Sequence, residues 1–328
     1  MELRKFGPDD AGAIRLAVEI ENAHHAVDCP WLHPLTVYRQ EMEMRHGWDG
    51  ETGSWFLAYD AGVPVGLLSL DTSEWDNRDL AWLGVAIHPA HRRRGHGTRA
   101  LSLLQQLAAQ MGRSLVGIDG WDAPGVHAFA DATGFARKSQ AIHRRLHYAD
   151  VDLDVVRALR DGAAGAAAAY ELVGVTGHTP GAMLGAVAGL SAAINDAPTD
   201  DLEYEDEVYP PERIRDYEDA QAEAGFRLHR LLARHRESGE LVGHTVVALD
   251  SERPTQSEQH DTSVVAAHRG HRLGLLLKAE MILRLAYDEP QLELVDTWNA
   301  ESNLHMIGVN DQRGYRALGR ELAFQRRL

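Results

Sequence analysis

The sequence is poor in cysteine and has no long apolar run. Cys29 is the only cysteine among 328 residues, which excludes an internal disulfide and a zinc site built from several cysteines. No stretch approaches the roughly 18 apolar residues of a membrane-spanning helix. The N-terminus also lacks the apolar core of a signal peptide. We therefore expect a cytoplasmic protein that does not enter a membrane.

Positive charge is also scarce. The chain has 33 lysines and arginines against 49 aspartates and glutamates, a formal net charge of −16. Such a chain repels a phosphate backbone, so we expect no nucleic-acid partner. With 44% hydrophobic and 25% charged residues, the composition is that of a globular protein. The length suggests two domains at about 150 residues each.

An internal repeat supports two domains. Several residue types recur at one offset of 177 residues, through a glycine-bearing turn, a basic loop and a tryptophan. Near the end of each copy the offset becomes 180, at Gly134 and Gly314. A spacing this long indicates repeated domains rather than solenoid units. The pairs at offset 177 are Gly62/Gly239, Gly66/Gly243, His91/His268, Arg92/Arg269, Gly97/Gly274 and Trp121/Trp298.

Both copies predict the same order of elements. Each begins with a strand, two helices and a strand hairpin, followed by a strand, the basic loop and a long amphipathic helix. A further strand, a short helix and a terminal hairpin complete each copy. The pattern predicts an α/β fold with a mixed sheet, built from domains at residues 1–150 and 170–328. Residues 151–169 form a helical or flexible connector.

The basic loop is the first candidate site. In "HPAHRRRGHGTRAL", starting at His88, a strand end leads through arginines and glycines into a helix. The free N–H groups at a helix start attract an anion such as a pyrophosphate. Gly95 and Gly97 allow close backbone approach. Neither G-x-x-x-x-G-K-[ST] nor G-x-G-x-x-G occurs here. A solvated helix cap is the alternative interpretation.

The segment Arg92-x-x-Gly95-x-Gly97 resembles the acetyl-CoA signature R/Q-x-x-G-x-G/A of the GNAT acetyltransferase superfamily. The second half resembles the C-terminal unit of tandem GNAT proteins of actinobacteria. The resemblance implies a mixed sheet whose fourth and fifth strands diverge, acetyl-CoA in that gap, and direct transfer to an amine. The implied cofactor-binding residues are Val85, Ile87, Arg92, Arg93, Arg94, Gly95, His96, Gly97 and Thr98, and then Val264, Val265, Arg269, Gly270, His271, Arg272, Leu273 and Gly274.

Arg272 stands where the first loop has Gly95. If the position requires a positive φ, arginine there costs roughly 1 kcal/mol. If it does not, Arg272 simply adds a cation beside the pyrophosphate. We favour the second interpretation.

The second half carries more candidate catalytic groups. The tyrosine that protonates the thiolate in many GNAT enzymes is replaced by Ala130 and Asn310. Strand four of the second half opens with three candidate bases, Glu258, His260 and Asp261. The alternative is that they are ordinary exposed residues of the strand. Strict alternation places Glu258 and His260 on one face and Asp261 on the other. Two further asparagines, Asn299 and Asn303, are candidates to bind the pantetheine amides. The alternative is a capping role, in which Asn299 or Ser302 starts the helix.

The resemblance implies that the acidic block at residues 196–223 lines the acceptor groove, which would favour a cationic amine. The alternative is that this charge run is a solvated surface. The histidines of the first half lack the spacing of a metal site, so we expect no metal. Together these features predict an acetyl-CoA-dependent N-acetyltransferase of a small amine, monomeric or homodimeric, with the C-terminal domain catalytic. The alternatives are a non-catalytic acyl-CoA-binding or scaffold protein, and activity in the N-terminal domain alone.

Overall fold

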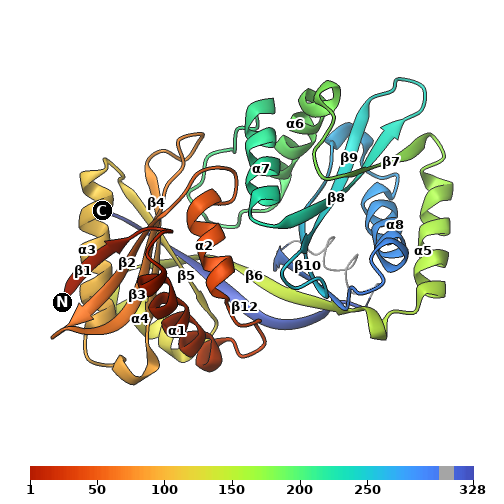
Figure 1. Cartoon of the computed structure of the whole chain (residues 1–328). Coiled ribbons are helices and arrows are strands. Elements are labelled where there is room, and N and C mark those ends of the chain that lie inside the picture. Colours follow the sequence, from red (N-terminus) through yellow and green to blue (C-terminus); the bar gives the residue numbers. More distant parts are fainter. Residues whose placement is uncertain (303–313) are drawn as a thin grey trace. The chain divides into compact units, whose positions relative to one another are not determined.

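The protein is described by a computed structural model over residues 1–302 and 314–328. Figure 1 shows its elements. In the first half they are β1 (Glu2–Phe6), α1 (Ala11–Asp28), α2 (Val37–His46), β2 (Ser54–Asp60), β3 (Val63–Asp71), β4 (Leu80–Ile87), α3 (His96–Gln110), β5 (Leu115–Trp121), α4 (Pro124–Thr133) and β6 (Ala136–His147). In the second half they are α5 (Leu153–Ala166), β7 (Tyr170–Thr176), α6 (Leu184–Ala192), α7 (Pro211–Glu223), β8 (Phe226–His235), β9 (Leu241–Asp250), β10 (Gln256–Val264), α8 (Leu273–Asp288), β11 (Leu294–Ala300) and β12 (Arg316–Arg327).

This order confirms the predicted α/β fold with a mixed sheet, and residues 153–166 of the connector form helix α5. The predicted terminal hairpins are wrong. β6 and β12 are single strands of 12 residues each. Gly319 in β12 does not mark a turn. A Cβ at that position would lie 2.1 Å from the Trp31 ring. The glycine therefore leaves space for the Trp31 side chain to pack against the strand.

The contacts divide the chain into two compact units that are not the two halves of the sequence. Unit 1 comprises Met1–Ala141, Thr199–Glu207 and Gly319–Leu328, and unit 2 comprises Ile142–Pro198 and Val208–Leu318. The C-terminal strand therefore belongs mostly to unit 1, and the end of β6 belongs to unit 2. The boundaries at residues 150 and 170 remain a prediction about the two copies of the repeat.

Unit 1 is a sheet with helices on both faces. Its strand order is β1-β2-β3-β4-β5-β12, and β12 runs antiparallel to β5 with Phe324 beside Ile118. One face packs against α1 and α2 through a core that includes Ile14, Met44 and Leu67. The other face packs against α3 and α4 through a separate core.

Unit 2 repeats the arrangement. Its strands follow the order β11-β10-β9-β8-β7, with the end of β6 beside β11. Helices α5 and α8 lie against each other and share one core with β8 and β9 (Figure 1). A smaller core joins α6 and α7 to the sheet around Leu190, Ile214 and Leu232.

Candidate functional site

The fourth and fifth strands separate in both units. β4 and β5 pair in parallel from Leu80–Trp82 to Leu115–Gly117 only. β10 and β11 pair over Gln256–Glu258 and Leu294–Asp296 only. The predicted pantetheine-contacting residues all lie beyond these pairs: Val85, Ile87, Val264 and Val265. The backbone there does not pair with the fifth strand of its unit.

The two basic loops share an unusual backbone. Each has two residues in the left-handed region, at the same repeat positions. In the first loop these are Arg93 (φ 61°) and Gly95 (φ 79°), and in the second Gly270 (φ 86°) and Arg272 (φ 57°). The glycine has thus exchanged places with the arginine between the copies, and both loops keep one turn shape.

This geometry corrects the preferred interpretation of Arg272. The position does require a positive φ, because the loop conformation is the same whichever residue occupies it. Each loop therefore holds one arginine in a conformation that costs roughly 1 kcal/mol or more. The second loop lacks a glycine at position 272 but has one at Gly270, where the first loop has Arg93, so each loop contains one strained arginine.

The loops end at helix starts without side-chain caps. Gly95 begins α3 and Arg272 begins α8, and neither makes a side-chain cap hydrogen bond. The first turns contain the remaining predicted binding residues: His96, Gly97 and Thr98 in one helix, and Leu273 and Gly274 in the other. Uncapped N–H groups with the helix dipole behind them attract an anion.

The first arginine of each loop makes a structural contact. Arg92 donates to the carbonyl of Ile87 at 3.0 Å and to both oxygens of Asp28, at 3.0 and 2.7 Å. Arg269 donates to the carbonyl of Val264 at 3.0 Å and to Asp196 at 2.5 Å. Each guanidinium thus ties the loop to the end of its strand. Three further predicted residues lie beside them in the loops: Arg93, Arg94 and His271, whose ring is 5.6 Å from that of Tyr170.

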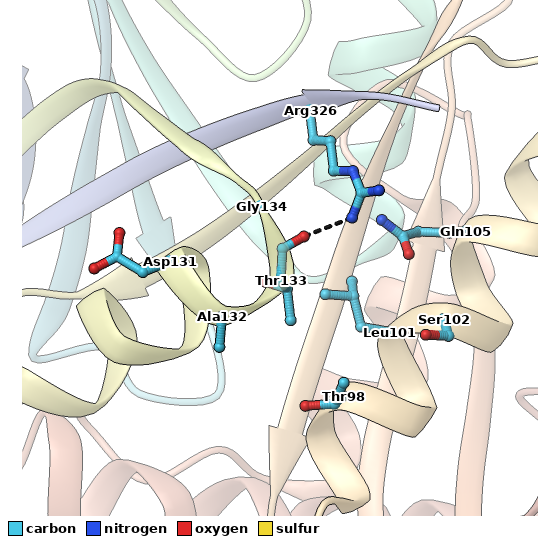
Figure 2. A pocket seen from close by; sticks show the side chains of 9 residues that line it. All are labelled: Thr98, Leu101, Ser102, Gln105, Asp131, Ala132, Thr133, Gly134 and Arg326. Atoms are coloured by element: carbon cyan, nitrogen blue, oxygen red, sulfur yellow. Dashed lines mark hydrogen bonds between the residues drawn. The ribbon is translucent and has the colours of Figure 1, made fainter.

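A pocket adjoins the first loop. It has a volume of about 510 Å³ and lies between α3 and the end of α4 in unit 1 (Figure 2). Thr98, Ser102 and Gln105 line its α3 wall. On the other side Arg326 donates to the carbonyl of Thr133 at 2.5 Å. The pocket therefore extends from the helix start and offers polar groups along its length.

In unit 2, a β-bulge changes the relation between two of the predicted bases, His260 and Asp261. The register of β10 against β9 shifts between Gln259 and Thr262. As a result His260 contacts Tyr217 on α7 at 2.6 Å, while Asp261 contacts His244 on β9 at 2.5 Å. The predicted separation of Asp261 onto the opposite face is wrong, because the extra residue of a bulge breaks the alternation.

Burial keeps both His260 and Tyr217 uncharged. Burial, with the positive charge of Arg230, lowers the pKa of His260 to about 3, so its ring is neutral at pH 7. Burial raises the pKa of Tyr217, so the phenol keeps its proton beside Nδ1 of His260. His260 is therefore a weak base, and Glu258, which is exposed, and Asp261 are stronger candidates.

A buried polar chain lies behind Asp261. Arg230 donates to Nδ1 of His244 at 2.9 Å. Since a guanidinium only donates, His244 must carry its proton on Nε2 and donate it to Asp261. Arg230 also contacts Glu218 at 3.3 Å, and Glu218 accepts from the Thr179 hydroxyl at 2.5 Å. His244, Arg230, Glu218 and Thr179 are each at most 3% exposed. This series of buried hydrogen bonds fixes the orientation of the Asp261 carboxylate.

The predicted asparagines are only partly described. Asn299 lies in β11, whereas Asn303 and Asn310 lie outside the described residues. Near Asn299 the carboxylate of Asp296 is held by Arg145. Burial would raise the pKa of Asp296, but the hydrogen bonds from Arg145 and His143 outweigh it and lower that pKa.

One polar group at the end of β5 was not predicted from the sequence. Asp119 accepts a hydrogen bond from the indole N–H of Trp82 on β4. Burial, followed by the negative charge of Glu321, raises the pKa of Asp119 to about 7. An acidic residue near the end of an otherwise apolar strand was the available signal, but nothing in the sequence places Glu321 beside it.

The acidic block does not act as one surface. Residues 199–207 belong to unit 1, where Glu203 contacts Lys138 at 3.3 Å and Asp200 contacts Ser139 at 2.8 Å. This segment therefore corrects the expectation that the whole block lines the acceptor groove of the second copy. Of the remainder, Asp196 and Glu218 are held by arginines.

Metal ligands do not gather in the described part of the chain. No group of three or more histidines, cysteines or acids in residues 1–302 and 314–328 is placed to hold a metal ion. Within the same ranges, none of the helices has the length and hydropathy that crossing a bilayer requires.

Known proteins resemble the chain in sequence and fold. Residues 20–135 match the acetyltransferase (GNAT) family. A mycothiol acetyltransferase of Stackebrandtia nassauensis is 33% identical over 116 residues, which are 34% of this chain and 37% of that protein. The chain thus spans little more than a third of this relative.

Solved structures match over nearly the whole chain. A tandem GNAT protein from the clavulanic acid biosynthesis pathway has a TM-score of 0.81 and 25% identity, covering 99% of this chain and 98% of its own. A GCN5-related N-acetyltransferase from Sphaerobacter thermophilus has a TM-score of 0.69 at 15% identity, covering 99% and 95%. The second likeness shows the fold alone.

Proposed function

Through residues 20–135 the chain belongs to the GNAT acetyltransferase family, and from this premise we propose that it N-acetylates a small cationic amine with acetyl-CoA. The observation that carries the proposal is the pair of loops with one shared backbone, each leading to an uncapped helix start. A feature retained in both copies despite the exchange of glycine and arginine is best explained by a common ligand.

The diphosphate of acetyl-CoA would be held by the N–H groups of Gly95–Thr98 or of Arg272–Gly274. The pantetheine arm would run along β4 or β10 past the last strand pair. Arg92 and Arg269 would keep each loop in position rather than contact phosphate, because both are already bonded to carboxylates. In unit 1 the pocket beside Thr98 offers room for another part of the donor.

Unit 2 is the favoured catalytic half. Glu258 and Asp261 lie where β10 leaves β11, and their charges attract a protonated amine. One of them would take a proton from the amine, which then attacks the thioester carbonyl. The orientation of Asp261 by His244 and the buried chain supports that role. Asn310, which stands where many GNAT enzymes have a tyrosine, lies outside the described residues.

The test is thiol release from acetyl-CoA with a panel of diamines, polyamines and amino sugars. In a chain whose first loop is blocked by Gly97→Glu, so that only unit 2 can hold the donor, we expect Glu258→Gln or Asp261→Asn to lower the rate by about a hundredfold or more. Glu237→Gln in the exposed β8–β9 turn should leave it unchanged. Tight acetyl-CoA binding without thiol release across the panel would contradict an enzyme and favour the acyl-CoA-binding or scaffold alternative.

A further inference from the structure

We propose that unit 1 contains a second proton-transfer site, in which Asp119, held by the Trp82 indole and facing the same side of the sheet as Glu321 of the C-terminal strand, accepts the proton of an amine. This inference rests on the proposed acetyl transfer but adds an active site to it. The reaction would be complete within unit 1, using the donor held by the first loop.

The first support is the position of Asp119. Trp82 and Gly117 are the last pair between β4 and β5, and Asp119 is two residues further along β5 on the same face. The carboxyl thus stands just past the point where the strands separate. Protein surrounds much of the carboxyl, but the residue remains exposed, so an acceptor can reach it.

The second support is the fixed partner of that carboxyl. The Trp82 indole donates its N–H to Asp119. The ring has room because position 117 is glycine: a Cβ there would lie 2.2 Å from the indole. Gly117 therefore permits the close packing that aims the indole N–H at the carboxyl.

The third support is the group contributed by β12. Glu321 pairs with Trp121 and Ala323 with Asp119, so Glu321 and Asp119 share one face of the sheet. Burial raises the pKa of Glu321. Cys29, which follows α1, is a further titratable group near Glu321. The pKa of its thiol is raised to about 12 by burial and by the charges of Glu21, Asp28 and Glu321. Negative neighbours therefore surround this end of the sheet.

The corresponding strand of unit 2 provides a contrast. Asp296 lies 177 residues after Asp119, but Arg145 and His143 of β6 hold it as a carboxylate. Each fifth strand is thus flanked by a terminal strand encoded in the other copy of the repeat. β12 supplies an acid to Asp119, and β6 supplies a cation to Asp296. Of these two, Asp119 is the one left able to exchange a proton near neutral pH.

The proposed step balances. An ammonium acceptor gives one proton to the Asp119 carboxylate, and the freed nitrogen lone pair forms a bond to the thioester carbonyl carbon. The C–S bond then breaks, and the sulfur leaves with its electron pair and takes the second proton from nitrogen. The products are the amide and the free thiol, and Asp119 returns its proton to water.

The experiment uses the full chain with unit 2 silenced by Gly274→Glu, which places a carboxylate in the first turn of α8, where the diphosphate would bind. In this background we expect thiol release with an amine panel to rise with pH through a midpoint near 7. Asp119→Asn, which still accepts from Trp82, should lower the rate by about a hundredfold. Glu321→Gln should move the midpoint to lower pH without removing activity. Asp9→Asn, in the exposed turn before α1, is the matched control.

A carboxyl titration followed by 13C NMR provides a readout without an acceptor. One aspartate resonance should titrate near pH 7 and disappear in Asp119→Asn. If that resonance is absent, or if Asp119→Asn leaves both rate and pH profile unchanged, the inference is overturned. If the wild-type chain releases thiol but the Gly274→Glu form does not, the second site fails and the proposed function stands. Thiol release from no form of the chain would overturn the proposed function itself.

Discussion

Arg145 donates hydrogen bonds of 2.7 Å to both carboxylate oxygens of Asp296. Their side chains are 9% and 8% exposed. Such a buried pair is costly to break from one side, because the remaining charge keeps no partner. We expect Arg145→Met to lower the free energy of unfolding by about 3 to 5 kcal/mol, measured by urea denaturation. Arg157→Met, from an exposed pair with Asp154, should change it by less than about 1 kcal/mol.

The same pair makes stability depend on acid. The pKa of Asp296 is lowered in the folded protein, so the stability it contributes is present above the unfolded pKa of about 4 and is lost as pH falls through the folded value. The Arg145→Met chain should lose this part of the dependence. An identical pH profile in both chains would contradict the interpretation of the pair.

The second loop predicts opposite effects at two glycines four residues apart. Gly270 has a φ of 86°, so Gly270→Ala should lower the free energy of unfolding by about 1 kcal/mol. Gly274 lies inside the first turn of α8, where a Cβ would meet no atom within 4 Å, so Gly274→Ala should be neutral or raise stability by up to about 1 kcal/mol. Equal losses at both positions would show that φ is not the cause.

His260, a buried base rather than an acid, also makes the free energy of unfolding depend on pH. Its pKa is lowered to about 3 in the folded chain by burial and Arg230, against about 6.5 when unfolded. Between these values only the unfolded chain takes the proton, so stability falls as pH falls below about 6. We expect His260→Asn to reduce that slope by up to about 1.4 kcal/mol per pH unit.

The matched control for His260 is His178→Asn, since His178 is 47% exposed and pairs with Asp219 on the surface. Unfolding should be measured at several values between pH 4 and pH 7. If both variants keep the wild-type slope, the neutral buried state of His260 is wrong.

The repeat and its loops were predictable from the sequence because they depend on local signals. Glycine, arginine and an apolar helix follow one another at a fixed offset, and these signals alone identify Gly97 and Gly274. The resemblance of these loops to the GNAT signature also predicted the helix starts and the separation of the fourth and fifth strands.

Long-range pairing was not predictable in the same way. The alternation of apolar residues in β12 predicts a strand but not its neighbour in the sheet. Nothing in residues 316–327 therefore indicates that this strand pairs with β5. The bulge after Gln259 contains no glycine or proline from which it could have been predicted. Consequently the shared face of His260 and Asp261, and the meeting of Glu321 with Asp119, emerge only from the sheet.

Acetyl-CoA binding at the two helix starts is the property on which both proposed sites depend. Isothermal titration of the wild-type chain with acetyl-CoA, compared with Gly97→Glu, Gly274→Glu and the double variant, measures it directly. We expect each single variant to lose binding at one unit and the double variant to bind none. Binding of acetyl-CoA by the double variant with wild-type affinity, or no binding by the wild-type chain, would contradict the assignment of both loops.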